Sequence, residues 1–141
     1  MDVLFLTTRS QYSETRYAES ACCRQDGGGA MEPKCRVWVV FGEKVKLGDG
    51  RAHLLELIDE LGSLRQAVVQ IGMSYRNAWG YLRDLEKAAG FKLLERRSGG
   101  GPKSGMQLTQ DGRAFLAKYW RFRKHVDTVV ERQFARIFSK K

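Results

Sequence analysis

The first regular pattern along the chain is an alternation of β-branched and aromatic residues over residues 36–47. Because successive side chains on a strand point to opposite faces, this two-residue period predicts a strand. Gly42 interrupts the run and is expected to mark a bend or a bulge in that strand. The sequence Gly48-Asp49-Gly50 that follows predicts a turn, and Asp49 or Gly50 can start the helix that comes next.

Three stretches with the spacing of amphipathic helices come next. Their apolar residues recur three or four positions apart, which places them on one face of a helix. The stretches are residues 51–61, 64–71 and 75–89. Gly62 and the pair Gly72 and Met73 separate them. Ser63 and Ser74 stand where a hydroxyl oxygen caps the N-terminus of a helix. The sequence therefore predicts three helices in a row, the last two joined by a tight turn.

A second pair of extended segments precedes the last helix. Residues 91–97 and 106–108 have the composition of strands and flank a Gly-rich loop at residues 98–105, a pattern that predicts a β-hairpin. Thr109 stands at the N-cap position of a helix that is predicted to run to about Phe138. The expected fold class is mainly α with a small β wing: a winged helix-turn-helix followed by a long C-terminal helix.

These patterns divide the chain into three parts. Residues 1–30 have few aliphatic side chains after the first six residues and end near a run of glycines, which is typical of a flexible tail. Residues 31–112 hold the predicted winged helix-turn-helix, and residues 113–141 hold the long helix, which is expected to mediate dimerisation. Because the dense pattern begins after Met31, we hypothesise that Met31 is the biological start. Mass spectrometry of the native N-terminus tests this.

The charge of the chain points to a polyanionic partner. Lys and Arg number 25 against 16 Asp and Glu, which leaves a formal charge of +9 and a pI near 9.7. The first thirty residues hold three arginines and four acidic residues, so the excess lies in the part predicted to fold. This balance favours nucleic acid as the partner, with a basic protein that binds none as the alternative.

Two of the predicted helices have the order and spacing of a helix-turn-helix. A short first helix packs across the second and leaves the N-terminus of the second free to enter a major groove roughly 12 Å wide. Arginine pairs there with guanine and asparagine with adenine, while a glycine lets the backbone come close to the duplex. The residues of this segment expected to contact DNA are Ser63, Ser74, Tyr75, Arg76, Asn77, Gly80 and Arg83.

Some residues of this segment have a second interpretation. Tyr75 either contacts DNA or packs on the preceding helix, and Arg83 either binds a phosphate or pairs with Glu86 on the surface. Trp79 is expected to pack within the helix pair, because so large a side chain is more often buried than in contact with a base. The two residues after Tyr75 have no evident structural role, so the DNA interpretation is stronger for them.

The strand–loop–strand segment at residues 91–108 predicts a wing beside the recognition helix. Wings reach the minor groove or the flanking phosphates of DNA. Arg96, Arg97 and Lys103 are expected to make those contacts. A nucleotide-binding phosphate loop is the rival interpretation of the glycines, but the GxxxxGK[ST] spacing is absent and no helix follows directly.

The last helix carries an apolar stripe with the period of a coiled coil. Its residues, four, three, four and three positions apart, are Phe115, Tyr119, Phe122, Val126 and Val129. A stripe of this kind needs a partner, which is either the first helix of the same chain or a second copy. A two-fold homodimer would present two recognition helices to half-sites about one turn of double-stranded DNA apart.

Taken together, these residues resemble a known family. The matching segments are residues 48–51, 62–64, 72–79, 93–96, 99–101 and 108–112, with S-Y-R-N-A-W at 74–79 and the glycines of the wing as the most specific parts. They are similar to the N-terminal domain of the ModE family of molybdate-responsive transcription regulators, which is related to the winged helix of LysR-type regulators. The resemblance covers about residues 36–125.

The resemblance implies a DNA-binding homodimer, with residues 74–77 at the start of the recognition helix and Lys103 in the wing. Full-length members of the family carry oxyanion-binding domains after the long helix, whereas this sequence ends at Lys141. Molybdate binding of that kind is therefore not expected. A link to molybdenum-related genes is implied by association only, and an effector would be a separate protein or oxyanion sensor.

Other function classes find less support in the sequence. His53 and His125 lie far apart and no catalytic triad, metal-ligand set or carboxylate pair is found, so neither an enzyme nor a cofactor or metal is expected. Cys22, Cys23 and Cys35 lack the spacing of a zinc site, and reduced thiols in the cytoplasm are expected. No apolar run approaches the roughly 18 residues of a membrane span.

Two alternatives stay open. A protein-interaction module that senses redox state or metal is one, and a non-specific architectural DNA binder is the other. A large ratio of specific to non-specific affinity separates a regulator from an architectural protein.

Overall fold

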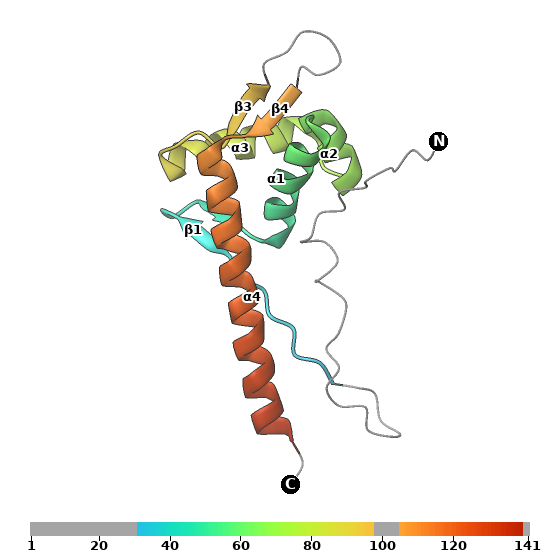
Figure 1. Ribbon diagram of the computed structural model, residues 1–141, viewed down its shortest axis with the longest axis vertical. Coiled ribbons are helices and arrows are strands. Elements are labelled where there is room, and N and C mark those ends of the chain that lie inside the picture. The colour runs from blue at the N-terminus through green and yellow to red at the C-terminus, as the bar shows by residue number, and fades with distance from the viewer. Residues whose placement is uncertain (1–30, 98–104, 140–141) are drawn as a thin grey trace, which may run out of the picture. The chain divides into compact units, whose positions relative to one another are not determined.

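The apolar patterns of the sequence form helices and two hairpins in the computed structural model, which describes residues 31–97 and 105–139 (Figure 1). The elements are β1 (Val39–Phe41), β2 (Val45–Leu47), α1 (Asp49–Leu61), α2 (Leu64–Ile71), α3 (Tyr75–Ala89), β3 (Leu94–Arg97), β4 (Gly105–Leu108) and α4 (Gln110–Phe138). Strand β1 pairs antiparallel with β2, and β3 with β4. The predicted fold class, a winged helix-turn-helix followed by a long helix, is confirmed. The predicted tail, residues 1–30, lies outside the described part.

The segment at residues 36–47 is a hairpin and not the single strand that its alternation predicts. Val39 lies opposite Leu47, and Phe41 lies opposite Val45. The chain reverses at Gly42, whose φ of 58° lies in the left-handed region that glycine adopts without strain. A single strand and a hairpin share the same two-residue period, so the alternation alone does not locate the reversal.

Helix α1 begins at Asp49, one of the two expected starts, because the carbonyl of Gly48 already accepts the backbone N–H of Ala52. The boundary of one strand differs from the prediction. Strand β3 begins only at Leu94, whereas the composition predicts a strand from residue 91. The chain before Leu94 is held by a side chain of α3 instead of by a neighbouring strand, as described below.

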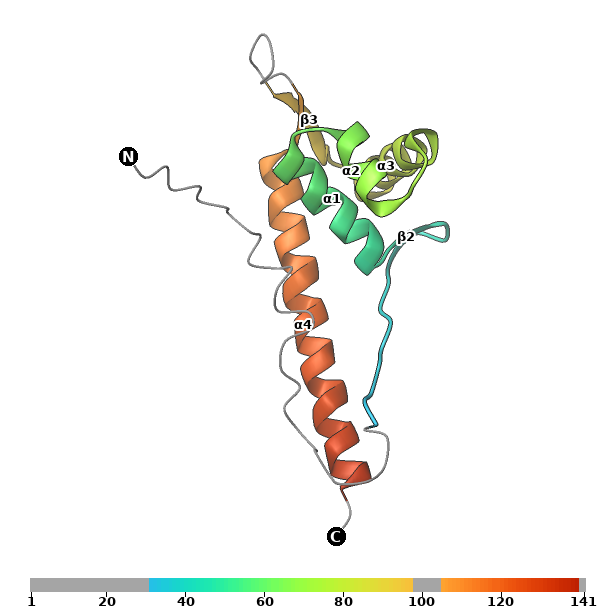
Figure 2. The same cartoon turned by 90° about the vertical axis from the view of Figure 1, so that its right-hand side faces the viewer.

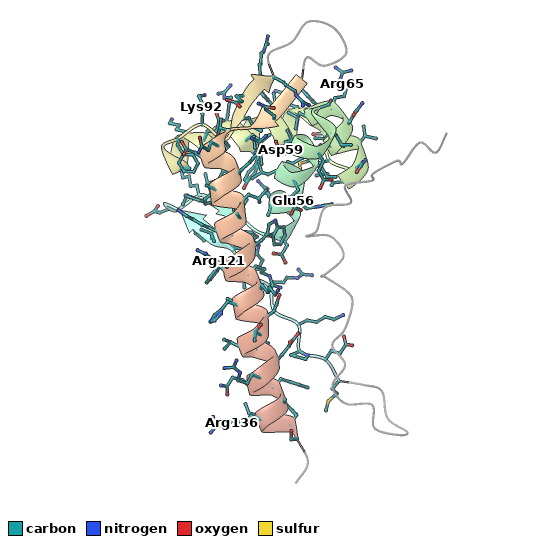
Figure 3. All side chains as sticks on the ribbon, viewed as in Figure 1. Glu56, Asp59, Arg65, Lys92, Arg121 and Arg136 are labelled. Carbon is teal, nitrogen blue, oxygen red and sulfur yellow. The ribbon has the colours of Figure 1, made fainter. Side chains whose placement is uncertain are left out.

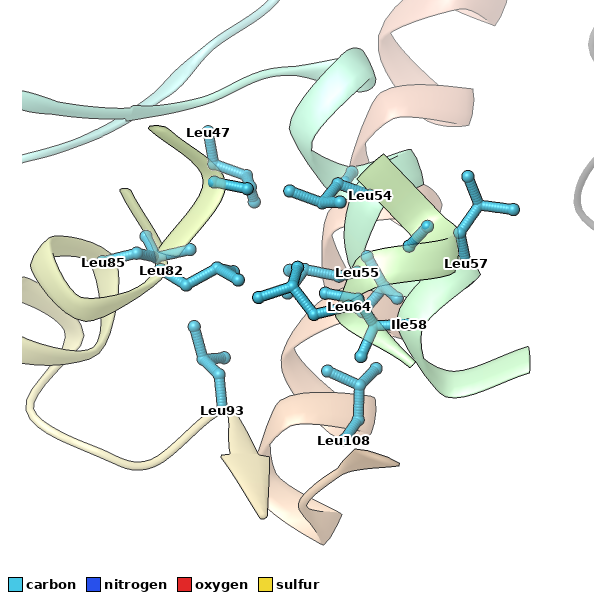
Figure 4. Packing of buried hydrophobic residues seen from close by; sticks show 14 of the residues in the cluster. Leu47, Leu54, Leu55, Leu57, Ile58, Leu64, Leu82, Leu85, Leu93 and Leu108 are labelled. Carbon is cyan, nitrogen blue, oxygen red and sulfur yellow. The ribbon is translucent and has the colours of Figure 1, made fainter. Parts of the chain in front are cut away.

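The core consists mainly of leucines contributed by all four helices and both hairpins (Figure 4). Helix α1 supplies its centre, since Leu54, Leu55 and Ile58 are fully buried. Burial of each such side chain contributes about 1.5–3 kcal/mol to folding. Helices α2 and α3 pack on one side of α1 with Leu64 and Leu82, and so the position of the recognition helix depends on this cluster.

The predicted N-caps of three helices are confirmed. The hydroxyl oxygen of Ser63 accepts the backbone N–H of Gln66 at 3.3 Å, and that of Ser74 accepts the N–H of Asn77 at 3.2 Å. Thr109 caps α4 in the same way. Each cap satisfies a donor that the first turn of a helix leaves without a partner, which typically stabilises the fold by about 1 kcal/mol.

Helix α4 packs on the domain with its first half and continues past it with its second (Figures 1 and 2). Leu116, Tyr119 and Trp120 are buried, whereas Phe122 and Val129 are 48% and 41% exposed. The second half of α4 therefore has an apolar surface that the domain does not cover. No helix in the described part of the chain has the length and apolarity needed to cross a membrane.

Candidate nucleic-acid interface

The outer face of α3 carries three basic residues and a glycine in one line. Arg76, Gly80, Arg83 and Lys87 recur four, three and four positions apart, so they lie above one another on the helix. All four are exposed, and they lie opposite the buried residues Ala78, Leu82 and Leu85. Lys87 is not among the residues that the sequence analysis expected to contact DNA, although its spacing of four positions from Arg83 places it on the same face.

The first turn of α3 is open to solvent. Tyr75 is 47% exposed, and Arg76 and Asn77 are exposed as well. The guanidinium of Arg65 on α2 lies 6.0 Å from the centre of the Tyr75 ring, so this ring is beside the preceding helix and still accessible. Ser74 caps the turn by accepting the Asn77 N–H, and the N-terminus of a helix in general favours an anion.

Arg83 does not pair with Glu86, its alternative partner. The Glu86 carboxylate instead accepts the backbone N–H groups of Leu93 at 2.9 Å and Leu94 at 3.0 Å, and the Lys92 ammonium at 3.1 Å. Among the described residues, no carboxylate lies within ion-pair distance of Arg83 or of Arg76. Both guanidinium groups are therefore available to a partner outside the chain.

Trp79 lies beside the wing. It is 41% exposed and lines a cleft with Leu94 of β3 and Met106 of β4. The sequence predicts that this side chain packs within the helix pair, but the structure places it between α3 and the hairpin β3–β4. The size of the side chain alone does not decide between these two places.

The described part of the wing carries two of its predicted cationic residues. Arg96 and Arg97 are exposed on β3, opposite Met106 and Gly105 of β4. Lys103 belongs to residues 98–104, which lie outside the described part of the chain. Its predicted contact with DNA stays a prediction.

Hydrogen bonds from distant parts of the chain fix the base of the wing. The backbone N–H of Met106 donates to the Gly62 carbonyl at 2.8 Å, and the N–H of Leu108 donates to the Asp59 carboxylate at 3.0 Å. Asp59 also accepts two bonds from the Arg113 guanidinium, at 2.8 and 2.9 Å, and the hydrogen bond to Asp59 raises the pKa of Arg113. The wing, α1 and α4 are thereby joined at one carboxylate.

Asp59 and Glu86 were not identified from the sequence. Their partners lie up to 54 residues away along the chain, and nothing in the local pattern distinguishes them from other surface carboxylates on a helix. Figure 3 shows Asp59 within the domain and Lys92 near the base of the wing.

Tyr81 holds the other flank of α3. Its hydroxyl donates to the Lys46 carbonyl on β2 at 3.0 Å, and the Arg51 guanidinium lies 3.7 Å from the centre of its ring. Burial raises the pKa of Tyr81 to about 12, although the nearby Arg51 charge acts in the opposite direction. Helix α3 is thus attached to a hairpin on each side.

The predicted stripe of α4 falls into two parts. Phe115 packs against Phe41 and Phe91, with ring centres 5.7 and 5.9 Å apart, and Tyr119 is only 3% exposed. The Tyr119 hydroxyl donates to Asp49 of α1 at 2.7 Å. These first two positions therefore contact the domain itself, and Tyr119 contacts its first helix, which was one of the two partners expected for the stripe. The other three positions, Phe122, Val126 and Val129, lie further along α4 and are half-buried or exposed.

The described residues contain no group of three or more His, Cys, Asp or Glu placed to hold a metal ion. His53 contacts Glu56 of the same helix at 3.2 Å. Cys35 is a free thiol, and its backbone carbonyl accepts a bond from Arg123 at 2.8 Å. Cys22 and Cys23 lie outside the described residues.

Comparison with known proteins relates the helices and the wing to a family of regulators. Residues 51–113, from α1 to the first turn of α4, match the family described as "Bacterial regulatory helix-turn-helix protein, lysR family". This part of the chain is therefore similar to the helix-turn-helix domains of LysR-type proteins. Helix α3 and the hairpin β3–β4 both lie within the matched segment.

The predicted resemblance to the ModE regulators is confirmed by similar proteins. "Molybdenum transport protein ModE" of Azotobacter vinelandii is 37% identical over 73 residues, 52% of this chain and 27% of the relative. "Transcriptional regulator ModE" of Haemophilus influenzae is 36% identical over 69 residues, 49% of this chain and 27% of the relative. "DNA-binding transcriptional dual regulator ModE" of Escherichia coli K12 is 32% identical over 89 residues, which are 63% of this chain and 34% of the relative. The chain thus matches about a quarter to a third of the length of these relatives.

Proposed function

We propose that the chain is a sequence-specific DNA-binding transcription regulator. The first turn of α3 enters the major groove, Arg76 and Asn77 read base edges, and Arg83 binds a phosphate. The observation that supports this most directly is the exposure of Tyr75, Arg76 and Asn77 on a capped helix end whose arginine has no carboxylate partner among the described residues.

The wing and the second half of α4 complete the proposal. Arg96, Arg97 and Lys103 contact the backbone or the minor groove beside the recognition helix. Two copies associate through the apolar surface of α4 around Phe122 and Val129, and each copy presents one recognition helix to one half-site in the cytoplasm.

The names of the similar ModE proteins connect this domain with molybdenum. We infer that genes related to molybdenum are candidate targets, and that an oxyanion or a separate protein supplies the signal. Neither catalysis nor a cofactor is part of this proposal. Titration of the DNA complex with molybdate tests the oxyanion directly, since a change in affinity means that this chain responds to it without help.

The decisive experiment is selection of bound duplexes from a random pool, followed by titration at several salt concentrations. A regulator yields one preferred sequence, bound about 10³-fold or more tightly than other duplexes. Arg76→Ala is expected to cost about 1–3 kcal/mol at one base position and to relax the preference there. Lys103→Ala is expected to weaken the binding of all DNA sequences about equally. A pool without any preferred sequence would leave only a non-specific DNA binder.

A further inference from the structure

The cleft between α3 and the wing is lined by apolar and by charged side chains. Trp79, Leu94 and Met106 are among its apolar residues. Arg83 of α3 and Arg96 of the wing line it as well, and are called its rim residues below. Trp79 is 41% exposed. Its position is unusual for so large an apolar side chain, because it lies beside the exposed basic face of α3 and is not enclosed by the core.

The two acidic residues of the cleft, Glu86 and Glu95, differ in their hydrogen-bond partners. The Glu86 carboxylate accepts three hydrogen bonds, one of them from the Lys92 ammonium, so its charge is largely compensated. Glu95 accepts only the neutral Gln107 amide at 2.8 Å among the described side chains. Arg83 has no ion-pair partner in the described ranges. The lining that α3 contributes to the cleft is therefore cationic, because the charge of Arg83 is not compensated there.

We propose that this cleft holds one stretch of the sugar–phosphate backbone of DNA, with a deoxyribose against the Trp79 ring and phosphates at Arg83 and Arg96. The chemistry of the two surfaces corresponds, because apolar sugar faces alternate with anionic phosphates along a DNA strand, and the lining of this cleft combines an indole ring with two guanidinium groups. This inference rests on the proposed function, because a helix docked in the major groove brings the bordering strand to its wing side.

The proposal makes Trp79 a positioning residue that acts on every DNA sequence alike. A short mixed-sequence duplex is therefore a sufficient probe, since sugars and phosphates are the same in all sequences. In the full chain, Trp79→Ala is expected to weaken binding of this duplex about tenfold, the effect of losing roughly 50 Å² of buried apolar surface. Trp79→Phe keeps an aromatic face and is expected to retain most of the affinity.

The two rim residues are tested by salt dependence. Arg83→Gln and Arg96→Gln are each expected to reduce the slope of log affinity against log salt concentration by about 1, because each removes one phosphate contact. Arg121→Gln is the matched control, because Arg121 is an exposed arginine on α4, away from the wing (Figure 3). Its slope is expected to equal that of the unchanged chain. Glu95→Gln removes a negative charge from the cleft and is expected to strengthen binding.

Tryptophan fluorescence reports contact at the cleft independently of affinity. The chain has three tryptophans. Besides Trp79 these are Trp120, which is buried, and Trp38, which is exposed directly before strand β1. Addition of the duplex is expected to change the emission of the unchanged chain and of Trp38→Phe. In Trp79→Phe this change is expected to disappear, although the variant still binds.

The outcomes separate the two proposals. If the unchanged chain binds no duplex, the proposed function and this inference both fail. If it binds, but Trp79→Phe shows the full emission change and Arg83→Gln and Arg96→Gln keep the slope, the cleft does not hold the backbone and the proposed function stands. Thermal unfolding of Trp79→Ala is measured alongside. Should that variant not fold, Trp79→Phe and the arginine variants decide.

Discussion

Gly80 lies midway along the basic face of α3, and nothing in the described part of the chain stands within 4 Å of the position of an added Cβ. Glycine inside a helix costs about 0.5–1 kcal/mol relative to alanine. Gly80→Ala is therefore expected to raise the free energy of unfolding by that amount in urea titrations. The same variant is expected to bind DNA several-fold more weakly, because its methyl group separates the backbone from the duplex. Unchanged binding would mean that DNA does not approach the helix at Gly80.

Tyr81 makes stability depend on pH at the alkaline end. Its pKa in the fold is about 12 and the ordinary value is 10.0, so folding favours the neutral phenol. This contribution is fully present below about pH 10 and is lost as the pH rises through about 12. The unchanged chain is expected to lose more stability than Tyr81→Phe over this window in urea unfolding. Parallel curves for the two proteins would contradict the raised pKa.

At the scale of elements, two glycines allow the wing and α4 to approach the rest of the domain. A Cβ at Gly105 would stand 2.1 Å from the Gly62 carbonyl oxygen, and one at Gly112 would stand 2.5 Å from the Leu93 carbonyl oxygen. Gly105→Ala and Gly112→Ala are each expected to lower the free energy of unfolding by about 1–3 kcal/mol, since backbone must move to admit the methyl group.

Gly50→Ala is the control for both variants, because the space around Gly50 is open and α1 accommodates alanine there. Urea unfolding is expected to give a stability for Gly50→Ala at or above that of the unchanged chain. Equal stabilities for all three variants would mean that the wing and α4 are not packed as closely as described.

At the scale of the whole molecule, the proposed association through α4 would double the proposed DNA-binding surface. Val129 is 41% exposed on the apolar side of the helix, and Thr128 is exposed at the preceding position. Val129→Asp is expected to shift the chain from dimer to monomer in sedimentation velocity experiments, because a carboxylate would be buried without a partner. Thr128→Asp adds the same charge outside the stripe and is expected to leave the dimer intact. A dimeric Val129→Asp would rule out this surface.

The helix-turn-helix was predictable because its determinants are local. The caps at Ser63 and Ser74 and the glycines that end the helices act within a few residues, and the apolar period of α3 determines which side faces out. For the same reason Arg76, Asn77 and Arg83 could be placed on the outer face before any tertiary contact was known. Lys87 follows from the same spacing.

Tertiary structure alone decided what depends on residues far apart in sequence. The chain reverses at Gly42, and Trp79 lies beside the wing. Asp59 accepts a backbone hydrogen bond from β4, and Glu86 accepts one from the residue before β3. Tyr119 could pack in the core or between two copies of α4. It packs in the core because Asp49 of α1 accepts a hydrogen bond from its hydroxyl. A hydrophobic period specifies a face of an element, but what covers that face is set by packing across the whole domain.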